Sequence, residues 1–194
     1  MVMNTKPILV KYDKKQQAIR MRQAAKLADV KAGDAVLDVG CGNVELIDYL
    51  PKGVEYVGVD YYKTKPFVVK YDISKGLPPS LRKRKFKAVF LLEFIEHMEN
   101  FRFILHQCKK VLVQGGVMIV SAPNPNRFHI DDHPDHIHSF TPLNMRNVAR
   151  QLGMRVAHKT GTYIAIPVIH KHVPSRMLLG TDTIVYALRA ERNK

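Results

Sequence analysis

Short apolar segments that end at an acidic residue recur along the first half of this chain. Segment 35–40, AVLDVG, is apolar and stops at a glycine, which is typical of a short buried strand. Three later segments of this kind end at acids: 54–60 at Asp60, 66–72 at Asp72 and 86–93 at Glu93. Strands that alternate with helices predict a parallel sheet covered by helices on both faces. The pattern therefore favours an α/β fold.

Hydrophobic periodicity predicts the remaining elements. An N-terminal helix is expected over about 12–28, and a short helix over about 44–50 that Pro51 ends. A fifth strand is expected over 117–124, a further helix around 145–152, and two β-rich segments over 155–166 and 181–189. An amphipathic helix follows the fourth strand, and the Gln-Gly-Gly stretch 114–116 is expected to stop it. Its apolar face comprises Phe101, Ile104, Leu105, Cys108, Val111 and Leu112.

The length of 194 residues fits a single domain over 1–194. No apolar run approaches the roughly 18–20 residues that span a bilayer, so we expect no membrane insertion. The N-terminal stretch lacks the apolar core and cleavage site of a signal peptide, which favours a cytoplasmic protein. The spacing of the two cysteines, Cys41 and Cys108, indicates neither a zinc site nor a disulfide framework.

The chain is strongly basic, with a formal net charge of +14. Such a charge favours a polyanionic partner such as RNA, DNA or an anionic membrane surface. A lysine-rich surface that only keeps the protein in solution is the alternative. The charge is concentrated in a basic N-terminal helix within 1–31 and in the stretch LRKRKFK at 81–87. Neither stretch has the interleaved aromatic residues of a base-stacking platform.

Acidic residues are expected to gather at one edge of the sheet, because they lie at or near the carboxyl ends of strands that run parallel. Ligands of such sheets bind beyond these ends. Asp38 lies near the end of the first strand, and the next three strands end in acids. Gly40 and Gly42 let the backbone turn tightly and approach a ligand. Asp60 ends the second strand. Its spacing in the sequence from the first strand is that of an acid that binds ribose hydroxyls. A dinucleotide fingerprint would place a third glycine at Glu45, which argues against a nicotinamide cofactor.

The segments VLDVGCGNVEL, VEYVGVD, VVKYDIS, FLLEFIEHMEN and LVQGGVMIVSAPN resemble, in this order, the motifs of class I S-adenosylmethionine (SAM)-dependent methyltransferases. The resemblance covers about 35–153. It implies a Rossmann-like fold with a mostly parallel seven-stranded sheet, helices on both faces and a C-terminal antiparallel strand. Two departures are Val44, where the family often has a third glycine, and Lys87, where it often has Asp. The residues that the resemblance places around SAM are Asp38, Gly40, Cys41, Gly42, Asp60, Tyr61, Asp72, Ile73, Leu92 and Glu93.

Glutamates and histidines cluster in two segments, LLEFIEHMEN (91–100) and NRFHIDDHPDHIHSFTP (126–142). The E-x-x-E-H pattern resembles that of ubiquinone-pathway O-methyltransferases. It also resembles that of small-RNA 3′-terminal 2′-O-methyltransferases, whose later "DH" pair corresponds to Asp135-His136. One reading is a divalent cation, Mg, Mn, Co or Zn, held by a mixed carboxylate and imidazole set. The predicted ligands are Glu93, Glu96, His97 and His136.

A reaction centre without a metal is the alternative, with His97 as a general base and Glu93 beside it as the predicted catalytic pair. The His-rich stretch 123–140 is expected to form the acceptor loop, and 167–180 is a candidate lid. The histidines of that loop are His129, His133, His136 and His138.

The leading prediction of function is SAM-dependent O-methylation of a small molecule, because the chain shows no added recognition domain. The alternative acceptor is RNA, with ribose 2′-O-methylation assisted by a metal. Two hypotheses of other classes are a nicotinamide-dependent oxidoreductase and a basic module that has lost SAM, for which Val44 is the hint.

Overall fold

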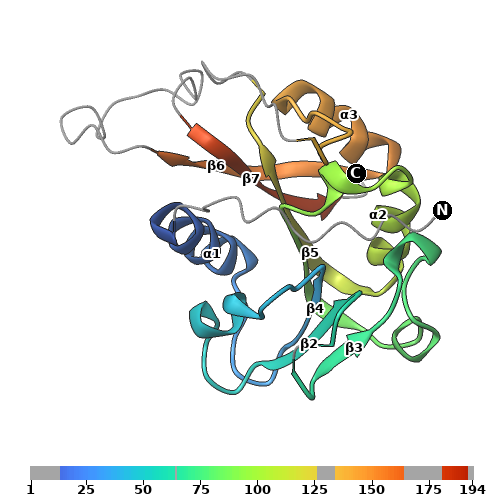
Figure 1. Ribbon diagram of the computed structural model, residues 1–194. Coiled ribbons are helices and arrows are strands. Elements are labelled where there is room, and N and C mark those ends of the chain that lie inside the picture. The colour runs from blue at the N-terminus through green and yellow to red at the C-terminus, as the bar shows by residue number, and fades with distance from the viewer. Residues whose placement is uncertain (1–13, 64, 126–133, 164–180, 192–194) are drawn as a thin grey trace.

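The computed structural model describes residues 14–63, 65–125, 134–163 and 181–191. Within them, one seven-stranded sheet has the strand order β3-β2-β1-β4-β5-β7-β6 (Figure 1). The strands are β1 (Ala35–Val39), β2 (Glu55–Asp60), β3 (Val68–Lys70), β4 (Phe86–Leu92), β5 (Leu112–Pro123), β6 (Met154–Tyr163) and β7 (Thr181–Ala190).

The strand directions place a ligand site at one edge of this sheet. β1 runs parallel to β2 and β4, β2 to β3, and β4 to β5. β7 lies between β5 and β6 and is antiparallel to both. The predicted mostly parallel sheet with a C-terminal antiparallel strand is therefore confirmed. Because the strand order reverses between β1 and β4, their carboxyl ends form the crevice in which such sheets bind ligands.

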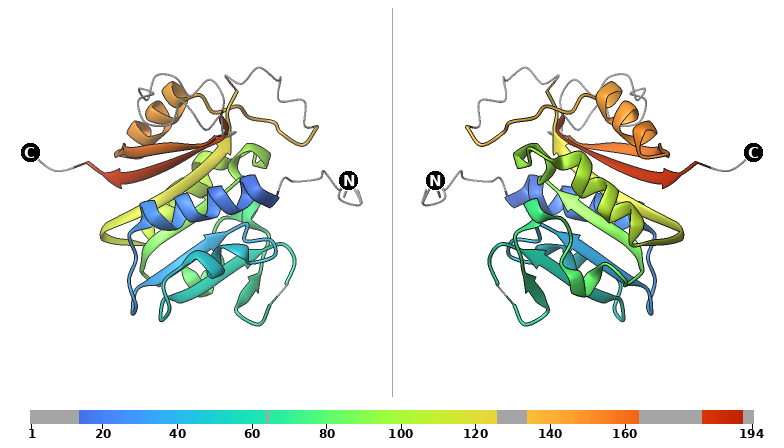
Figure 2. Two further views of the ribbon diagram at one scale, coloured as in Figure 1. Left: turned by 90° about the vertical axis from the view of Figure 1, so that its left-hand side faces the viewer. Right: turned by 90° about the vertical axis from the view of Figure 1, so that its right-hand side faces the viewer.

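Helices cover both faces of the sheet, as predicted. Helix α1 (Lys14–Ala28) and the 3₁₀ helix η1 (Glu45–Tyr49) lie on one face. Helices α2 (Phe101–Lys110) and α3 (Pro142–Gln151) lie on the other, and Figure 2 views the molecule from each side. The short 3₁₀ helices η2 (Ile73–Lys75), η3 (Pro79–Leu81) and η4 (Ile95–His97) complete the described elements.

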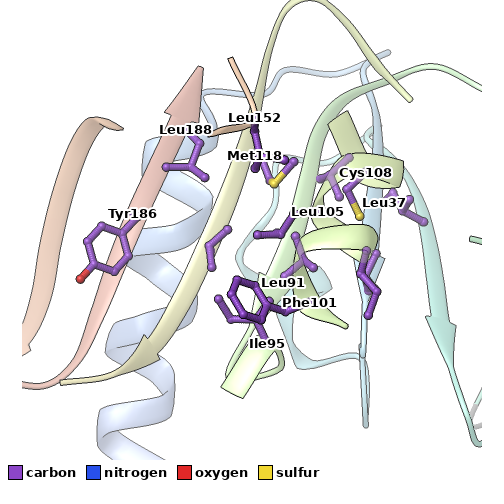
Figure 3. Close-up of a cluster of buried hydrophobic side chains, with 14 of the residues drawn as sticks. Leu37, Leu91, Ile95, Phe101, Leu105, Cys108, Met118, Leu152, Tyr186 and Leu188 are labelled. Atoms are coloured by element: carbon purple, nitrogen blue, oxygen red, sulfur yellow. The ribbon is translucent and has the colours of Figure 1, made fainter. Parts of the chain in front are cut away.

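The larger core lies between the sheet and the α2–α3 side (Figure 3). Leu105 and Cys108 of α2 are fully buried against Leu91 of β4 and Met118 of β5. β4 is buried along almost its whole length, as expected of a strand covered on both faces. This packing fixes the carboxyl end of β4, where Glu93 begins the segment that leads into η4.

The structure corrects the expected end of the amphipathic helix. That helix ends at Lys110, and the Gln-Gly-Gly stretch lies inside β5 instead of stopping the helix. Leu112 pairs with Phe86 and Val117 with Ala88, so the stretch forms an irregularity in the strand pairing. Gly115 supplies the positive φ of 74° that this bulge requires. Strand pairing with β4 therefore decides the conformation, although the apolar periodicity continues to Leu112.

Two other elements are shorter than predicted. The helix expected over 44–50 is only the 3₁₀ helix η1, since the left-handed backbone of Val44 starts it late and Pro51 follows its end. The third strand covers Val68–Lys70 rather than 66–72, because it pairs only with the last residues of β2.

Parts of other predictions fall outside the described residues. These parts are the first thirteen residues of the basic N-terminal segment, the loop residues 126–133 with His129 and His133, and the candidate lid 167–180. Among the described helices, none is both long enough and apolar enough to cross a membrane.

Candidate active site

The loop after β1 is held close to β2 and to the segment after β4. The amides of Gly40 and Cys41 donate to the carbonyl of Val59 at 2.8 and 3.3 Å. Gly40 has a φ of +73°, and a Cβ added to it would lie 2.2 Å from Cδ2 of Phe94. A side chain at this position would therefore both strain the backbone and collide with the aromatic ring.

Val44 adopts the left-handed conformation that the family's third glycine would adopt easily. Its φ is 68° and its ψ is 29°, and its side chain is buried. A β-branched residue rarely occupies this region, at a cost of about 1–2 kcal/mol. Burial of the valine side chain against the α1 side of the core offsets this strain. The departure at Val44 therefore leaves the turn itself intact.

Asp60 and Asp72 present carboxylates at the ends of two neighbouring strands. The Asp60 carboxylate accepts from the amides of Gly42 at 2.9 Å and Tyr62 at 3.0 Å, which fixes the loop to β2. Asp72 caps η2 and accepts from the Ser74 hydroxyl at 2.6 Å, and this hydrogen bond lowers the pKa of Asp72. The hydrogen bond from Ser74 thus favours the charged form of Asp72, and Asp60 lines the same opening.

A cavity of about 230 Å³ lies between these carboxylates and the glycine loop. Five predicted cofactor residues line it, namely Gly40, Asp60, Tyr61, Asp72 and Ile73, together with Tyr71, Ser74, Phe94 and Met98. A concave opening with two carboxylates and several aromatic rings suits a heteroaromatic ligand that carries hydroxyl and amino donors.

Asp38 and Cys41 lie beneath the loop and are not among the lining residues. The Tyr56 hydroxyl donates to the Asp38 carboxylate at 2.6 Å. Burial, aided by the nearby Asp60 charge, raises the pKa of Asp38 to about 7. The Cys41 sulfur faces Gly58, whose added Cβ would lie 2.7 Å from it, and burial raises the pKa of this thiol to about 12. Any contact of Cys41 with a ligand would therefore come from its backbone.

Glu93 follows β4 with a positive φ of 50°. Its carboxylate accepts hydrogen bonds from Ser121 of β5 at 2.9 Å and Thr183 of β7 at 3.2 Å. The Arg20 guanidinium of α1 lies 3.6 Å away, and both side chains of this pair are largely buried. These three partners fix the strained turn, since such a backbone persists only where its surroundings hold it. Leu92, the residue before it, is buried at the end of β4.

Arg20 is a site residue that the sequence analysis missed. Only 6% of it is exposed, and its Nε has no hydrogen-bond partner within the described part of the chain. A signal was available, because Arg20, Ala24 and Ala28 follow the i, i+4, i+8 spacing of one helix face. An arginine in register with an apolar stripe indicates a buried cation, and buried cations are usually paired.

Glu96, His97 and His136 form a group whose ligand atoms all lie within 4.8 Å of one another. Glu96 and His97 are successive residues of the short 3₁₀ helix η4, and a ligand atom of each lies close to one of His136. The amides of Ile137 and His138 donate to the Glu96 carbonyl at 2.9 and 3.2 Å, which fixes the loop that carries His136. Glu93, the fourth predicted ligand, is not part of this group among the described residues.

The tautomer of His97 follows from its hydrogen bond. Its Nδ1 lies 3.0 Å from the Asp135 carbonyl, which can only accept, so Nδ1 carries a proton and the neutral form of the ring has its lone pair on Nε2. The rings of His97 and His136 meet edge to face with centroids 4.8 Å apart. One carboxylate and two imidazoles suit a divalent transition metal, and a backbone carbonyl on the distal nitrogen is a common support for a metal-bound histidine. The same lone pair also suits a general base.

The cavity and the Glu96–His97–His136 group adjoin. Phe94 and Met98 line the cavity, and Glu96 and His97 lie between them in the sequence. A second ligand at the Glu96–His97–His136 group would therefore lie next to a ligand in the cavity. A second groove of about 380 Å³ includes His138, which follows His136 by two residues in the chain. It is lined by Phe101, Arg102, His138, Ser139, Phe140, Asn144, Asn147, Val148 and Gln151.

Comparisons with known proteins agree with this geometry. The model of the methyltransferase domain family matches residues 12–159. A ubiquinone biosynthesis O-methyltransferase from Pelagibacter ubique is 27% identical over 135 residues, an alignment covering 62% of this chain and 55% of the relative. One from a Bradyrhizobium strain is 27% identical over 131 residues, covering 62% and 52%. The chain thus spans about half the length of the curated relatives it matches.

Solved structures show the same fold. A SAM-dependent methyltransferase from Archaeoglobus fulgidus superposes with a TM-score of 0.67 at 20% identity, covering 89% of this chain and 93% of that one. The small RNA methyltransferase HEN1 gives a TM-score of 0.68 at 18% identity, covering 92% of this chain and 26% of that one. With a family model that matches most of its length and a sheet of the same architecture, this chain belongs to the methyltransferase domain family.

Proposed function

We propose that this protein is a SAM-dependent methyltransferase that methylates a hydroxyl oxygen, with a small molecule as the first candidate acceptor. The observation that carries the proposal is the cavity between Asp60 and Asp72, because Phe94 and Met98 of its lining flank Glu96 and His97 in the chain. Family membership supports the cofactor, and the O-methyltransferase names of the curated relatives support oxygen as the acceptor atom.

The residues of the cavity fit SAM better than a dinucleotide. Asp60 and Asp72 can accept from ribose hydroxyls and an adenine amino group, whereas they would repel a pyrophosphate. SAM also carries a carboxylate, for which the chain offers Arg20: its buried Nε–H has no hydrogen-bond partner among the described residues. SAM supplies an activated methyl group on a sulfonium, so the protein's tasks are to align the acceptor and exclude water.

The Glu96–His97–His136 group would activate the acceptor. A divalent cation held by these three residues would lower the pKa of an acceptor hydroxyl. Without a cation, Nε2 of His97 would take the hydroxyl proton, since the Asp135 carbonyl holds the proton on Nδ1. In both cases Glu93 acts from outside the group and positions the turn between β4 and η4 through its hydrogen bonds.

A ribose hydroxyl of RNA is the second candidate acceptor, and the second groove favours it. The groove combines three carboxamides, Asn144, Asn147 and Gln151, with aromatic rings, and none of the described residues that line it is acidic. Carboxamides provide the paired donor and acceptor that base edges require. A terminal nucleoside with its sugar at His136 would have room for a base or a neighbouring nucleotide there.

Calorimetry and transfer assays test the proposal. The protein should bind SAM and not NADH, and labelled SAM should transfer its methyl group to a catechol-type phenol or, for the second candidate, to the ribose of a short RNA. Tighter binding of NADH than of SAM would overturn the assignment. Transfer to an amine or carbon acceptor only would refute O-methylation while leaving the SAM assignment intact.

Chelation separates the two modes of activation. If a cation takes part, EDTA should abolish turnover without releasing SAM, and Mn or Co should restore it. His136→Ala should then reduce turnover by at least about tenfold, whereas His158→Ala, on the exposed part of β6, serves as the matched control. Full activity in EDTA together with loss in His97→Ala would identify His97 as a metal-free base.

A further inference from the structure

The basic stretch 81–87 lies at the edge of the sheet opposite the candidate active site. It runs into the start of β4, whose first residues are Phe86 and Lys87, whereas the active-site segment follows the end of that strand. A strand of this length separates its two ends by about 20 Å. In the left view of Figure 2, the start of β5 and the end of β7 lie on one side of the molecule and the segment after β2 on the other. The methyl-transfer site therefore leaves this positive charge unexplained.

Other cations join the stretch at this edge, because the strand directions bring them there. Lys110 comes just before β5, which is parallel to β4. β6 begins and the antiparallel β7 ends at the same edge, so Arg155 and Arg189 are direct partners in the strand pairing. We define the basic edge as Arg82, Lys83, Lys85, Lys110, Arg155 and Arg189, all exposed except the half-buried Arg189.

Three of these cations are held in place by backbone carbonyls, which do not neutralise their charge. Arg82 donates to the carbonyl of Leu77 at 2.8 Å, Lys85 to that of Lys110 at 2.8 Å and Arg189 to that of Gly115 at 3.1 Å. A carbonyl fixes the position of a cation but leaves its full charge. Of the four cations in 82–85, Arg84 alone forms an ion pair with a carboxylate of the described chain, that of Glu55 at 2.7 Å.

The pairing of Arg155 with Arg189 adds a cost that a ligand could remove. Like charges directly opposite each other on neighbouring strands destabilise a sheet. An anion bound between them would offset this repulsion. The basic edge therefore combines preorganised cations with an electrostatic cost in the free protein, and both favour a polyanionic partner.

We propose that the basic edge binds the phosphate backbone of RNA, separately from the methyl-transfer site. A membrane surface fits less well, because these strand ends expose little apolar area. Among the described residues, Val113 is the single exposed large apolar side chain there. Binding to a bilayer draws on buried apolar area as well as charge. Among the residues that the structure describes, the basic edge has no exposed aromatic side chain for base stacking, so its contacts would be with phosphates and independent of base sequence.

Salt dependence and charge reversal test the proposal in the full chain. The probe is a fluorescein-labelled 20-nucleotide single-stranded RNA of mixed sequence, followed by anisotropy. If about four phosphates are neutralised, raising the salt from 50 to 200 mM should weaken binding about 50-fold. The triple variant Arg82→Glu, Lys83→Glu, Lys85→Glu should weaken binding at 50 mM salt at least about 30-fold.

The matched control reverses three exposed lysines near the carboxyl ends of β2 and β3, Lys63, Lys65 and Lys70, with the same change in net charge. It should weaken binding less than about threefold. Arg82 and Lys85 also donate hydrogen bonds to backbone carbonyls, so charge reversal could disturb the fold. A milder triple variant therefore carries Arg82→Gln, Lys83→Gln and Lys85→Gln. Thermal unfolding checks the fold of each protein.

Three outcomes would overturn the proposal: no RNA binding at 50 mM salt, equal losses in both triple variants, or binding to phosphatidylserine vesicles without binding to RNA. Because the assay needs neither SAM nor turnover, its failure leaves the proposed methyl transfer untouched, and a failure of methyl transfer leaves this proposal untouched.

Discussion

Replacement of Gly40 by alanine tests how closely the glycine loop packs on the segment after β4. Gly40 has a φ of +73°, and the added Cβ would lie 2.2 Å from Cδ2 and 2.8 Å from Cγ of Phe94. Gly42 provides a matched control in the same loop, because its φ is +49° but nothing lies within 4 Å of an added Cβ. The two substitutions therefore share the backbone strain and differ in the collision.

The magnitudes follow from these two contributions. A left-handed backbone costs a residue with a Cβ about 1–2 kcal/mol. The lower conformational freedom of alanine in the unfolded chain offsets about 0.4–1 kcal/mol of this cost, so Gly42→Ala should destabilise the fold by roughly 0–1.6 kcal/mol. The collision of the added methyl group with Cγ and Cδ2 of the Phe94 ring adds about 1–3 kcal/mol. Gly40→Ala should therefore lower the free energy of unfolding by roughly 1–4.6 kcal/mol, which is about 1–3 kcal/mol more than Gly42→Ala.

Urea unfolding of both variants measures the difference, and calorimetry follows SAM binding. Gly40→Ala should also weaken SAM, because Phe94 lines the cavity and its ring must turn away from the new methyl group. In a Phe94→Ala background the same glycine substitution should cost no more than Gly42→Ala, which a double-mutant cycle detects. Equal destabilisation by the two glycine substitutions, or an unchanged cost without the ring, would refute the packing argument.

Three further predictions concern carboxylates of the site. Burial raises the pKa of Asp38 to about 7 from its ordinary 3.8. The folded state therefore holds a proton that the unfolded state has lost, so the free energy of unfolding should fall as pH rises from about 4 to about 7, and Asp38→Asn should flatten that slope in urea titrations. Arg20→Met leaves the buried Glu93 without its cation and should destabilise the protein by about 3 kcal/mol, much of which Arg20→Met with Glu93→Gln should recover. Asp60→Asn should weaken SAM by about 1.5–3 kcal/mol in calorimetry, and an unchanged affinity would remove Asp60 from the cofactor site.

The sequence by itself determined the type and order of most elements. Apolar segments with acids at their ends predicted the parallel strands, because a strand covered on both faces must be apolar and its exposed end can be polar. The same reasoning placed Asp60 and Asp72 at one edge, where the structure has them lining one cavity. The E-x-x-E-H pattern and the later Asp135-His136 pair predicted a ligand set of Glu93, Glu96, His97 and His136. The ligand atoms of the last three lie within 4.8 Å of one another.

Only the tertiary structure decided the partners of these residues. Glu93 was predicted as a metal ligand from its place beside Glu96, but its carboxylate is held by Ser121, Thr183 and Arg20, which come from three distant elements. Local spacing cannot reveal such partners, because they meet only when α1, β5 and β7 pack around the end of β4.

The separation of charge along the molecule was also beyond sequence reasoning. The basic stretch and the acidic strand ends are close in the sequence, yet β4 carries them to opposite edges of the sheet. The pairing of β6 with β7 then adds Arg155 and Arg189 to the basic edge. Composition determines the net charge of a chain, but the strand directions determine where that charge lies, because each strand exposes its two ends at opposite edges of the sheet.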